Sequence, residues 1–195
     1  MESAPVGVVT GANAGLGFET AEAAVRDGNV LVMAVRDVSR GERARREILR
    51  GSPNARVEVM ACDLADFASV RGFARAFAAR HERLDVLVCN SGVMALPERE
   101  VTVDGHEKQM QVNHSGHFLL TSLLLETMMR TKRDDGTKKR VVNVSSVAHN
   151  FGAWNFHDID SEEGFWGYPL LGWVTYGRTK MANILFTFEL DRRLK

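Results

Sequence analysis

Two stretches near opposite ends of the chain carry residue types that could act together in chemistry. Near the carboxyl end the sequence reads Tyr176-Gly177-Arg178-Thr179-Lys180, which puts a phenol and an amine four residues apart. Residues at this spacing share one helix face, so Lys180 would place positive charge beside Tyr176 and favour the tyrosinate. A tyrosine with an ordinary pKa near 10 is otherwise a poor base at neutral pH. The pair therefore indicates proton transfer, although this spacing alone is frequent by chance.

The other stretch, Thr10-Gly11-Ala12-Asn13-Ala14-Gly15-Leu16-Gly17, directly follows a short apolar run. Its three glycines suit a tight strand-to-helix turn, a close backbone approach to phosphates and close helix packing. The amides at the start of the next helix would then face a dinucleotide pyrophosphate. The alternative is an ordinary turn, since the Gly-x-x-x-Gly-x-Gly spacing departs from the commonest dinucleotide fingerprint.

The elements that must position these groups follow from the apolar patterns, in which short β-branched runs alternate with helical periodicity. Strands that are apolar on both faces need helices on both sides. This predicts an α/β fold with a parallel doubly wound sheet, Rossmann-like, in strand order 3-2-1-4-5. We expect strands at residues 6–10, 30–35, 56–61, 84–89 and 140–145, helices at about 15–27, 39–49, 66–81, 103–129 and 175–195, and an irregular segment at 147–174.

Composition limits the classes of protein that the chain can belong to. With 195 residues, of which 45% are hydrophobic, the chain is most simply a single domain spanning residues 1–195. Twenty-five basic residues balance twenty-five acidic ones, and no basic stripe appears, which argues against a nucleic-acid partner. Cys62 and Cys89 end strands that two others separate in the predicted order, which disfavours a disulfide. We expect no signal peptide, no transmembrane segment and a cytoplasmic location.

Taken in order, the motifs resemble the short-chain dehydrogenase/reductase superfamily, and within it the retinol dehydrogenase-like branch. The resemblance implies an enzyme that interconverts a carbonyl and an alcohol on a small-molecule substrate, with NADP(H) or NAD(H) as cofactor. It spans residues 6–194. The matching stretches are Thr10 to Gly17 with Glu19-Thr20, Cys62-Asp63-Leu64, Cys89 to Met94, Val112 to Phe118, Val141 to Ser146 and the Tyr176/Lys180 helix.

By this resemblance the cofactor touches the glycine turn, the ends of the next strands and the final helix. Asp63 and Leu64 would flank the adenine, and Lys180 would hydrogen-bond the nicotinamide ribose. The full set of implied cofactor-binding residues is Gly11, Asn13, Gly15, Leu16, Gly17, Arg36, Asp63, Leu64, Asn90, Ser91, Gly92, Tyr176 and Lys180.

The end of the second strand bears on the choice of nicotinamide. In this fold an acidic residue there receives the ribose hydroxyls of NAD, whereas an arginine accommodates the additional phosphate of NADP. The strand ends Ala34-Val35-Arg36-Asp37, and the planar guanidinium of Arg36 suits a phosphate. We therefore expect NADP(H), with a solvated surface arginine as the alternative. Asp37 would cap the following helix.

The resemblance implies four catalytic residues: Asn113, Ser146, Tyr176 and Lys180. Tyr176 would be the general acid/base, and Asn113 would anchor a water in the proton relay, with a buried structural amide as its alternative. Ser145 and Ser146 both end the fifth strand, and alternation sends their side chains to opposite faces. The residues alone do not choose between them, but the family pattern matches Ser146.

Two histidines, His114 and His117, stand three residues apart and could share a metal. No carboxylate or cysteine accompanies them in the motif, and relatives carry such histidines without metal, so we expect no metal site.

Thirty positions separate Ser146 from Tyr176, more than is usual in the superfamily. An aromatic lining would favour an apolar substrate of retinoid, steroid or long-chain aldehyde type. The alternative is that these aromatic side chains have no role in binding and simply anchor a long loop to the fold. They are Phe151, Trp154, Phe156, Phe165, Trp166, Tyr168 and Trp173.

The chain ends one helix after Tyr176, whereas members of the family continue to a sixth and a seventh strand. We therefore expect a domain that lacks its last two strands and is incomplete at its carboxyl end. Two other functions stay open: a double-bond reductase resembling light-dependent protochlorophyllide reductase, and a truncated, non-catalytic dinucleotide-binding or interaction module. A homodimer is also compatible with the resemblance.

Overall fold

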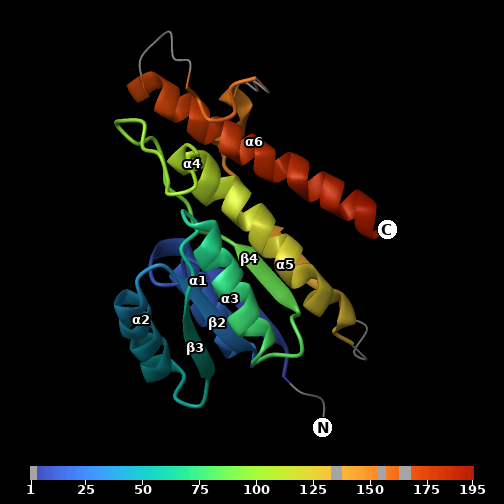
Figure 1. Cartoon of the computed structure of the whole chain (residues 1–195). Helices are drawn as coiled ribbons and strands as arrows, with labels where there is room; N and C mark the ends of the chain where they lie inside the picture. The colour runs from blue at the N-terminus through green and yellow to red at the C-terminus, as the bar shows by residue number, and fades with distance from the viewer. Residues whose placement is uncertain (1–3, 133–137, 153–156, 163–167) are drawn as a thin grey trace. The chain divides into compact units, whose positions relative to one another are not determined.

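The computed structural model of the chain describes residues 4–132, 138–152, 157–162 and 168–195 (Figure 1). Its central element is a five-stranded sheet in the order β3-β2-β1-β4-β5. This order confirms the predicted α/β doubly wound fold. The strands are β1 (Val6–Thr10), β2 (Val30–Val35), β3 (Arg56–Ala61), β4 (Val86–Cys89) and β5 (Arg140–Asn143).

The central strands form where β-branched runs are buried on both faces. Every residue of β1 and β2 is buried, and the two pair in parallel from Val6 opposite Val30 to Thr10 opposite Ala34. β1 also pairs in parallel with β4, and β2 with β3. Parallel pairing brings the carboxyl ends of these strands to one edge, where ligands bind in this architecture.

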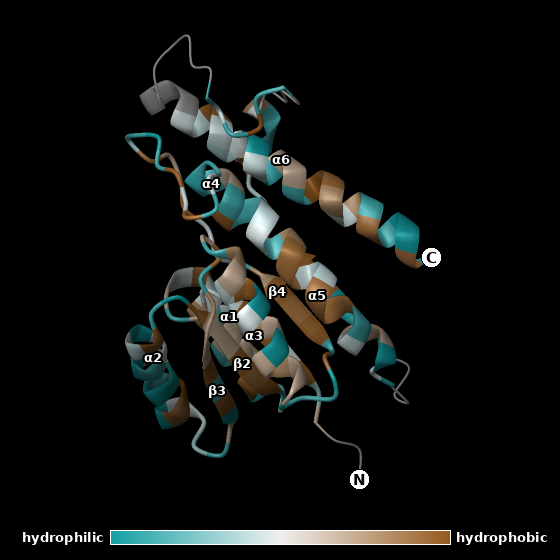
Figure 2. Ribbon diagram, in the orientation of Figure 1, coloured by the Kyte–Doolittle hydropathy of each residue, from teal (hydrophilic) through white to brown (hydrophobic). Residues whose placement is uncertain are grey.

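Helices cover both faces of the sheet. α1 (Gly15–Arg26) and α2 (Val38–Gly51) lie on one face, where Val25 and Ile48 join a buried cluster with Leu31 and Met33. α3 (Phe67–Ala78) and α5 (Gly116–Arg130) lie on the other face (Figure 1). Figure 2 shows the apolar residues concentrated in the strands, whereas hydrophilic residues line much of α2.

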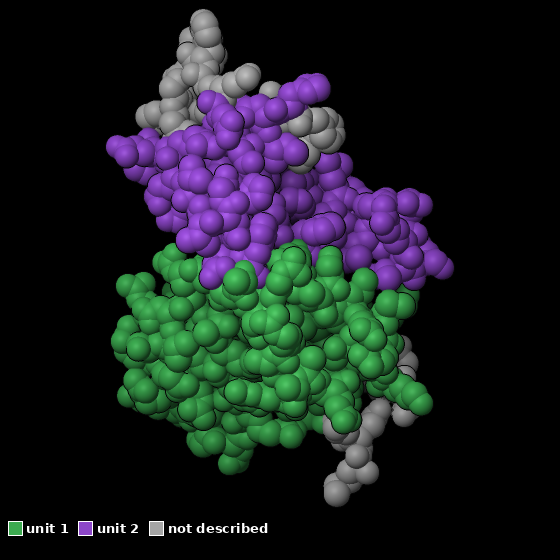
Figure 3. Space-filling model, in the orientation of Figure 1, with its two compact units in different colours: residues 1–63, 68–91, 119–142 green, residues 64–67, 92–118, 143–195 purple. Residues whose placement is uncertain are grey.

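The chain divides into two compact units (Figure 3). Unit 1 comprises residues 1–63, 68–91 and 119–142, and unit 2 comprises residues 64–67, 92–118 and 143–195. Unit 2 holds α4 (Lys108–Met110), the π-helical segment η1 (Gln111–Ser115), the 3₁₀ turn η2 (Val147–Phe151) and α6 (Tyr168–Leu194).

Several predicted boundaries are wrong. β4 begins at Val86 rather than at residue 84, and β5 ends at Asn143, so Ser145 and Ser146 follow the strand instead of ending it.

The last helix begins at Tyr168 rather than Thr175. Pro169 does not prevent this, because the backbone amides of a helix's first turn have no partner within the helix and the amide that proline lacks is not needed there. The helical region expected from Val103 starts at Lys108 and passes through a π-helical turn before α5. Residues 147–151 form a 3₁₀ turn within the segment expected to be irregular.

None of the helices in the described part of the chain combines the length and the apolar character needed to cross a bilayer.

Candidate functional site

The glycine turn after β1 has a backbone conformation and close contacts that exclude larger side chains at its glycine positions. Gly11 and Gly15 adopt φ of +66° and +54°, the left-handed region that glycine enters without strain. A Cβ on Gly17 would lie 2.5 Å from the carbonyl oxygen of Gly11. Backbone conformation or close packing therefore explains why each position is glycine. The absence of side chains also lets a ligand approach the backbone of the turn closely.

The start of α1 leaves its first amides available. Ala14 is the N-cap residue and makes no side-chain capping hydrogen bond, so the first turn of the helix keeps unpaired N–H donors. Leu16 is 74% exposed beside them, and Asn13 is half-buried. Such a helix start fits the pyrophosphate of a dinucleotide.

The turn rests on a contact between the ends of β1 and β4. The buried hydroxyl of Thr10 accepts hydrogen bonds from the amides of Asn90 and Ser91, at 2.9 and 3.0 Å. In return the Asn90 side-chain amide donates to the Thr10 carbonyl at 3.0 Å. This role of the Thr10 hydroxyl was not predicted from the sequence, where its position directly before the first glycine is the one indication of it.

At the end of β2, Arg36 and Asp37 have separate environments. Asp37 accepts a hydrogen bond from the Arg40 amide at 3.0 Å and caps α2, as predicted. That hydrogen bond lowers the pKa of the Asp37 carboxyl. Arg36 is exposed, at the same edge of the sheet as the glycine turn. Asp63, after β3, is half-buried and donates its amide to the Ser69 hydroxyl at 2.9 Å.

In unit 2, α6 presents Tyr176 and Lys180 one turn apart. The Lys180 ammonium nitrogen lies 5.5 Å from the centre of the Tyr176 ring and donates to the Val144 carbonyl at 3.0 Å. Burial lowers the pKa of Lys180. Trp173 meets the Tyr176 ring edge-on, with ring centres 6.4 Å apart. The predicted pairing of phenol and amine is therefore present within this unit.

Asn113 lies in the π-helical turn η1 and is fully buried. Its side-chain oxygen accepts from the Val93 amide at 2.8 Å, and its side-chain nitrogen donates to the Val93 carbonyl and the Thr179 hydroxyl. Its main-chain carbonyl accepts from His117 Nδ1 and Asn183 Nδ2, at 3.0 and 3.2 Å. These contacts show a buried amide with several partners, and the role of Asn113 in a proton relay stays a prediction.

Two further implied cofactor residues, Leu64 and Gly92, also belong to unit 2. Leu64 is buried, and its carbonyl oxygen would lie 2.7 Å from a Cβ on Gly116. A Cβ on Gly92 would lie 3.1 Å from the Asn113 side-chain oxygen and 3.8 Å from the Lys180 ammonium. Gly92 thus leaves space beside both groups.

The two serines after β5 have different partners. The Ser145 hydroxyl donates to the Lys180 carbonyl at 2.9 Å, so it ties the strand end to α6. The Ser146 hydroxyl accepts from the Ala148 amide at 3.2 Å and caps η2, which leaves its own proton for another acceptor. This difference favours Ser146 as the serine that meets a substrate oxygen.

Two glycines beside Tyr176 make a contact that the sequence pattern did not predict. A Cβ on Gly177 would lie 2.6 Å from the Ala148 carbonyl oxygen and 2.9 Å from the Gly152 amide nitrogen. The turn η2 therefore packs directly on the α6 backbone next to the tyrosine. The signal was a glycine placed within the Tyr-x-x-x-Lys motif.

The histidines of the motif hydrogen-bond in different directions. His114 Nδ1 lies 3.0 Å from the Asn183 side-chain oxygen, whereas His117 Nδ1 donates to the Asn113 carbonyl. Burial lowers the pKa of His117 to about 4 and lowers that of His114 as well. Within the residues that the structure describes, no cluster of three His, Cys, Asp or Glu residues could hold a metal ion.

The aromatic lining expected for the substrate is described only in part. Trp173 and Phe151 are 46% and 56% exposed. Trp154, Phe156, Phe165 and Trp166 lie outside the described residues, and Tyr168 enters only as the first residue of α6.

A parallel doubly wound sheet with a glycine turn at its carboxyl edge defines the class of dinucleotide-binding α/β proteins. The family model described as short chain dehydrogenase matches residues 5–157. The chain belongs to this family of oxidoreductases and is retinol dehydrogenase-like.

The chain is similar to human retinol dehydrogenase 11, with 46% identity over 188 residues that cover 96% of this chain and 56% of that protein. It is also similar to the human WW domain-containing oxidoreductase, with 41% identity over 195 residues covering 96% of this chain and 44% of that protein. The chain thus spans about half the length of the curated relatives that it matches.

Two solved structures share the fold. A protein of Mycobacterium paratuberculosis has a TM-score of 0.81 and 43% identity, covering 97% of this chain and 62% of the other. A metagenomic short-chain oxidoreductase in complex with NADP has a TM-score of 0.74 and 25% identity, covering 98% of this chain and 76% of the other.

Proposed function

We propose that this chain carries the cofactor-binding and proton-transferring residues of an NADP(H)-dependent oxidoreductase that interconverts a carbonyl and an alcohol. The observation that carries the proposal is the Lys180 ammonium beside the Tyr176 ring on α6. The glycine turn and the unpaired amides of α1 support the binding of a dinucleotide. The similarity to proteins named retinol dehydrogenases supports an apolar substrate, and the exposed Trp173 beside Tyr176 agrees with it.

When bound, NADPH would supply the hydride that the carbonyl carbon needs, and the glycine turn, Arg36 and Lys180 would hold the cofactor. The Tyr176 hydroxyl donates its proton to the carbonyl oxygen, so that an alcohol forms. Lys180 stabilises the tyrosinate through its positive charge, and Ser146 holds the substrate oxygen by donating its hydroxyl proton to a hydrogen bond. Asn113 holds the Val93 backbone and the Thr179 hydroxyl and so positions α6. In alcohol oxidation Tyr176 accepts the proton instead.

The preference for NADP(H) rests on Arg36. We expect Arg36→Ala to weaken NADPH binding by about 1.5 to 3 kcal/mol, because a charged hydrogen bond to the additional phosphate is lost. NADH binding should hardly change. Cofactor fluorescence on titration measures both affinities, and Arg43→Ala, which removes an exposed arginine of α2, is the matched control. An equal loss of affinity for NADPH and NADH would show that Arg36 does not contact the additional phosphate of NADP(H).

The sequence also left open a second function, a non-catalytic dinucleotide-binding module. The same titration, followed by turnover with a panel of aldehydes including retinal, separates the two functions. Binding with turnover supports the oxidoreductase, whereas binding without turnover supports the module. A cytoplasmic location and a homodimer stay predictions from the sequence.

A further inference from the structure

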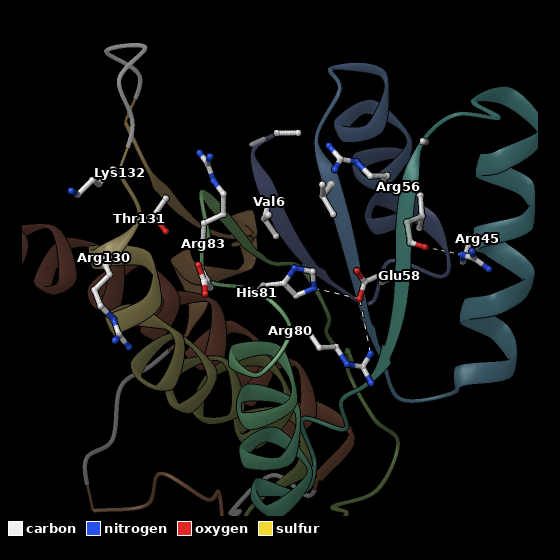
Figure 4. Close-up of a pocket in the computed structure, with 15 residues that line it drawn as sticks. Val6, Arg45, Arg56, Glu58, Arg80, His81, Arg83, Arg130, Thr131 and Lys132 are labelled. Atoms are coloured by element: carbon white, nitrogen blue, oxygen red, sulfur yellow. Dashed lines mark hydrogen bonds and ion pairs between the residues drawn. The ribbon is translucent and has the colours of Figure 1, made fainter. Parts of the chain in front are cut away.

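A concave region lies at the end of the sheet where the strands begin, opposite the glycine turn and within unit 1 (Figure 4). Its volume is about 860 Å³. The lining includes three buried valines from the beginnings of three strands, Val6 of β1, Val30 of β2 and Val57 of β3. The floor of the pocket is therefore apolar, and charged side chains surround it.

The charged lining is strongly positive. Two carboxylates, Glu58 and Glu82, face six basic side chains, a surplus of four positive charges without counting His81. The whole chain has equal numbers of acidic and basic residues, so this surplus is a local concentration rather than a property of a basic protein. The basic residues are Arg45, Arg56, Arg80, Arg83, Arg130 and Lys132.

Some of these charges already have partners. Glu58 lies 4.0 Å from the Arg80 guanidinium and 3.3 Å from the His81 ring, contacts drawn in Figure 4. Arg83 is paired with the buried Asp85 at 2.7 Å, and the Arg45 side chain donates to the Val57 carbonyl at 2.8 Å.

Other charges are not neutralised in this way. Arg130 pairs with Glu126 on the surface of α5, an exposed contact of little energy. Among the described residues no ion pair or hydrogen bond is found for the side chains of Arg56 and Lys132, and both are exposed at the pocket. These two cations are free to bind an anion from solution.

We propose that this pocket binds a small, soluble, phosphate-bearing molecule with at least two negative charges and an apolar part that contacts the three valines. Guanidinium groups match the geometry of phosphate oxygens, and the surplus of four positive charges around one concavity favours a dianion over a monoanion. The volume lies within the range of about 300 to 1,000 Å³ typical of small-molecule sites. This inference does not depend on the proposed redox activity.

Phenyl phosphate, a dianion with an apolar ring, is the probe. We expect its titration to cause saturable shifts of the Val57 and Thr131 amide signals in a proton–nitrogen correlation spectrum, with weaker binding as ionic strength rises from about 0.05 to about 0.5 M. Methyl phosphate should bind more weakly, because it lacks the ring that contacts the valines. The double variant Arg56→Gln/Lys132→Gln should bind phenyl phosphate about tenfold more weakly or worse.

Both substituted side chains are exposed, so the variant should fold, and circular dichroism checks this. Arg50→Gln/Arg71→Gln removes two exposed charges elsewhere in unit 1 and should bind like the parent chain. Equal weakening in the two double variants, shifts that do not saturate, equal affinity for both phosphates, or shifts confined to the amides around Gly15 would each overturn the proposal. If the chain sedimented with phosphatidylserine vesicles but did not bind phenyl phosphate, the basic side chains would bind a membrane surface, and the proposal would be overturned as well.

Discussion

At the scale of residues, the chemistry of unit 2 depends on which polar groups are already occupied. The Ser145 hydroxyl is used to hold α6, and the Asn113 side chain is used to hold Val93 and Thr179. The Tyr176 ring, by contrast, is half-buried next to the Lys180 ammonium, and Ser146 keeps its hydroxyl proton for another acceptor. Of these four side chains, Tyr176 and Ser146 therefore have the fewest hydrogen bonds to other described parts of unit 2.

His117 should make folding stability depend on pH. Burial lowers its pKa to about 4 in the folded chain, whereas an unfolded histidine titrates near 6.5. Between these values the unfolded chain binds the additional proton, so this contribution is complete above about pH 6.5 and is lost as the pH falls toward 4. The slope should reach at most about 1.4 kcal/mol per pH unit.

Urea unfolding at pH 7 and at about pH 5 measures the effect. His117→Gln should lose less stability on acidification than the parent chain, and His114, whose pKa is also lowered, would account for a remaining slope. Identical pH dependence of the two proteins would show that His117 does not remain neutral when folded.

At the scale of elements, the position of Ser146 relative to Tyr176 is set by how η2 packs on α6. The two backbones meet at Gly152 and Gly177, where a side chain on either residue would collide with the other segment. The π-helical turn η1 ends in α5 and carries Asn113, which bonds both to Val93 and to Thr179 of α6. Bulges of this kind often occur at functional sites.

Gly177→Ala should therefore destabilise the chain. Its Cβ would approach the Ala148 carbonyl to 2.6 Å, and overpacking of this kind costs about 1 to 3 kcal/mol. Urea unfolding measures the loss.

Gly72→Ala is the matched control, because a Cβ there has no neighbour within 4 Å and the residue lies inside helix α3. It should stabilise the chain by about 0.5 to 1 kcal/mol. A Gly177→Ala protein as stable as the parent chain would contradict the close contact between η2 and α6.

At the scale of the whole molecule, the structure comprises two compact units, with the glycine turn in unit 1 and the Tyr176/Lys180 pair in unit 2. Both cysteines are in unit 1, buried and free. Burial raises the pKa of Cys62 and of Cys89 to about 12, so neither forms a reactive thiolate near neutral pH.

The thiols should therefore report on global unfolding. We expect a disulfide reagent at about pH 8 to react slowly with the native chain, and the rate to rise in step with urea unfolding followed by circular dichroism. Cys62→Ala and Cys89→Ala variants assign the signal to each thiol. Rapid reaction of either thiol in the native chain would show local opening near the end of β3 or β4.

The local pattern of the sequence was enough to predict β1, β2 and β3 residue by residue, since short β-branched runs bounded by turns have few other conformations. It was also enough for Asp37 as a cap, because capping depends on the adjacent residues. The predicted start of α6 was wrong. Proline at 169 and glycine at 172 weaken a helix by propensity, but the first turn of a helix tolerates proline. The π-helical turn leaves no mark in apolar periodicity.

By itself, the sequence determined the strand order, the glycine turn and the Tyr-x-x-x-Lys spacing, because these depend on the apolar pattern of each segment and on rules of connection that hold for any parallel sheet. Only the tertiary structure revealed the different hydrogen-bond partners of Ser145 and Ser146, the partners of the Asn113 side chain and the concentration of cations around Val6, Val30 and Val57. Each of these depends on contacts between residues far apart in the chain, and a hydrogen-bond partner or a local electric charge is defined by those neighbours.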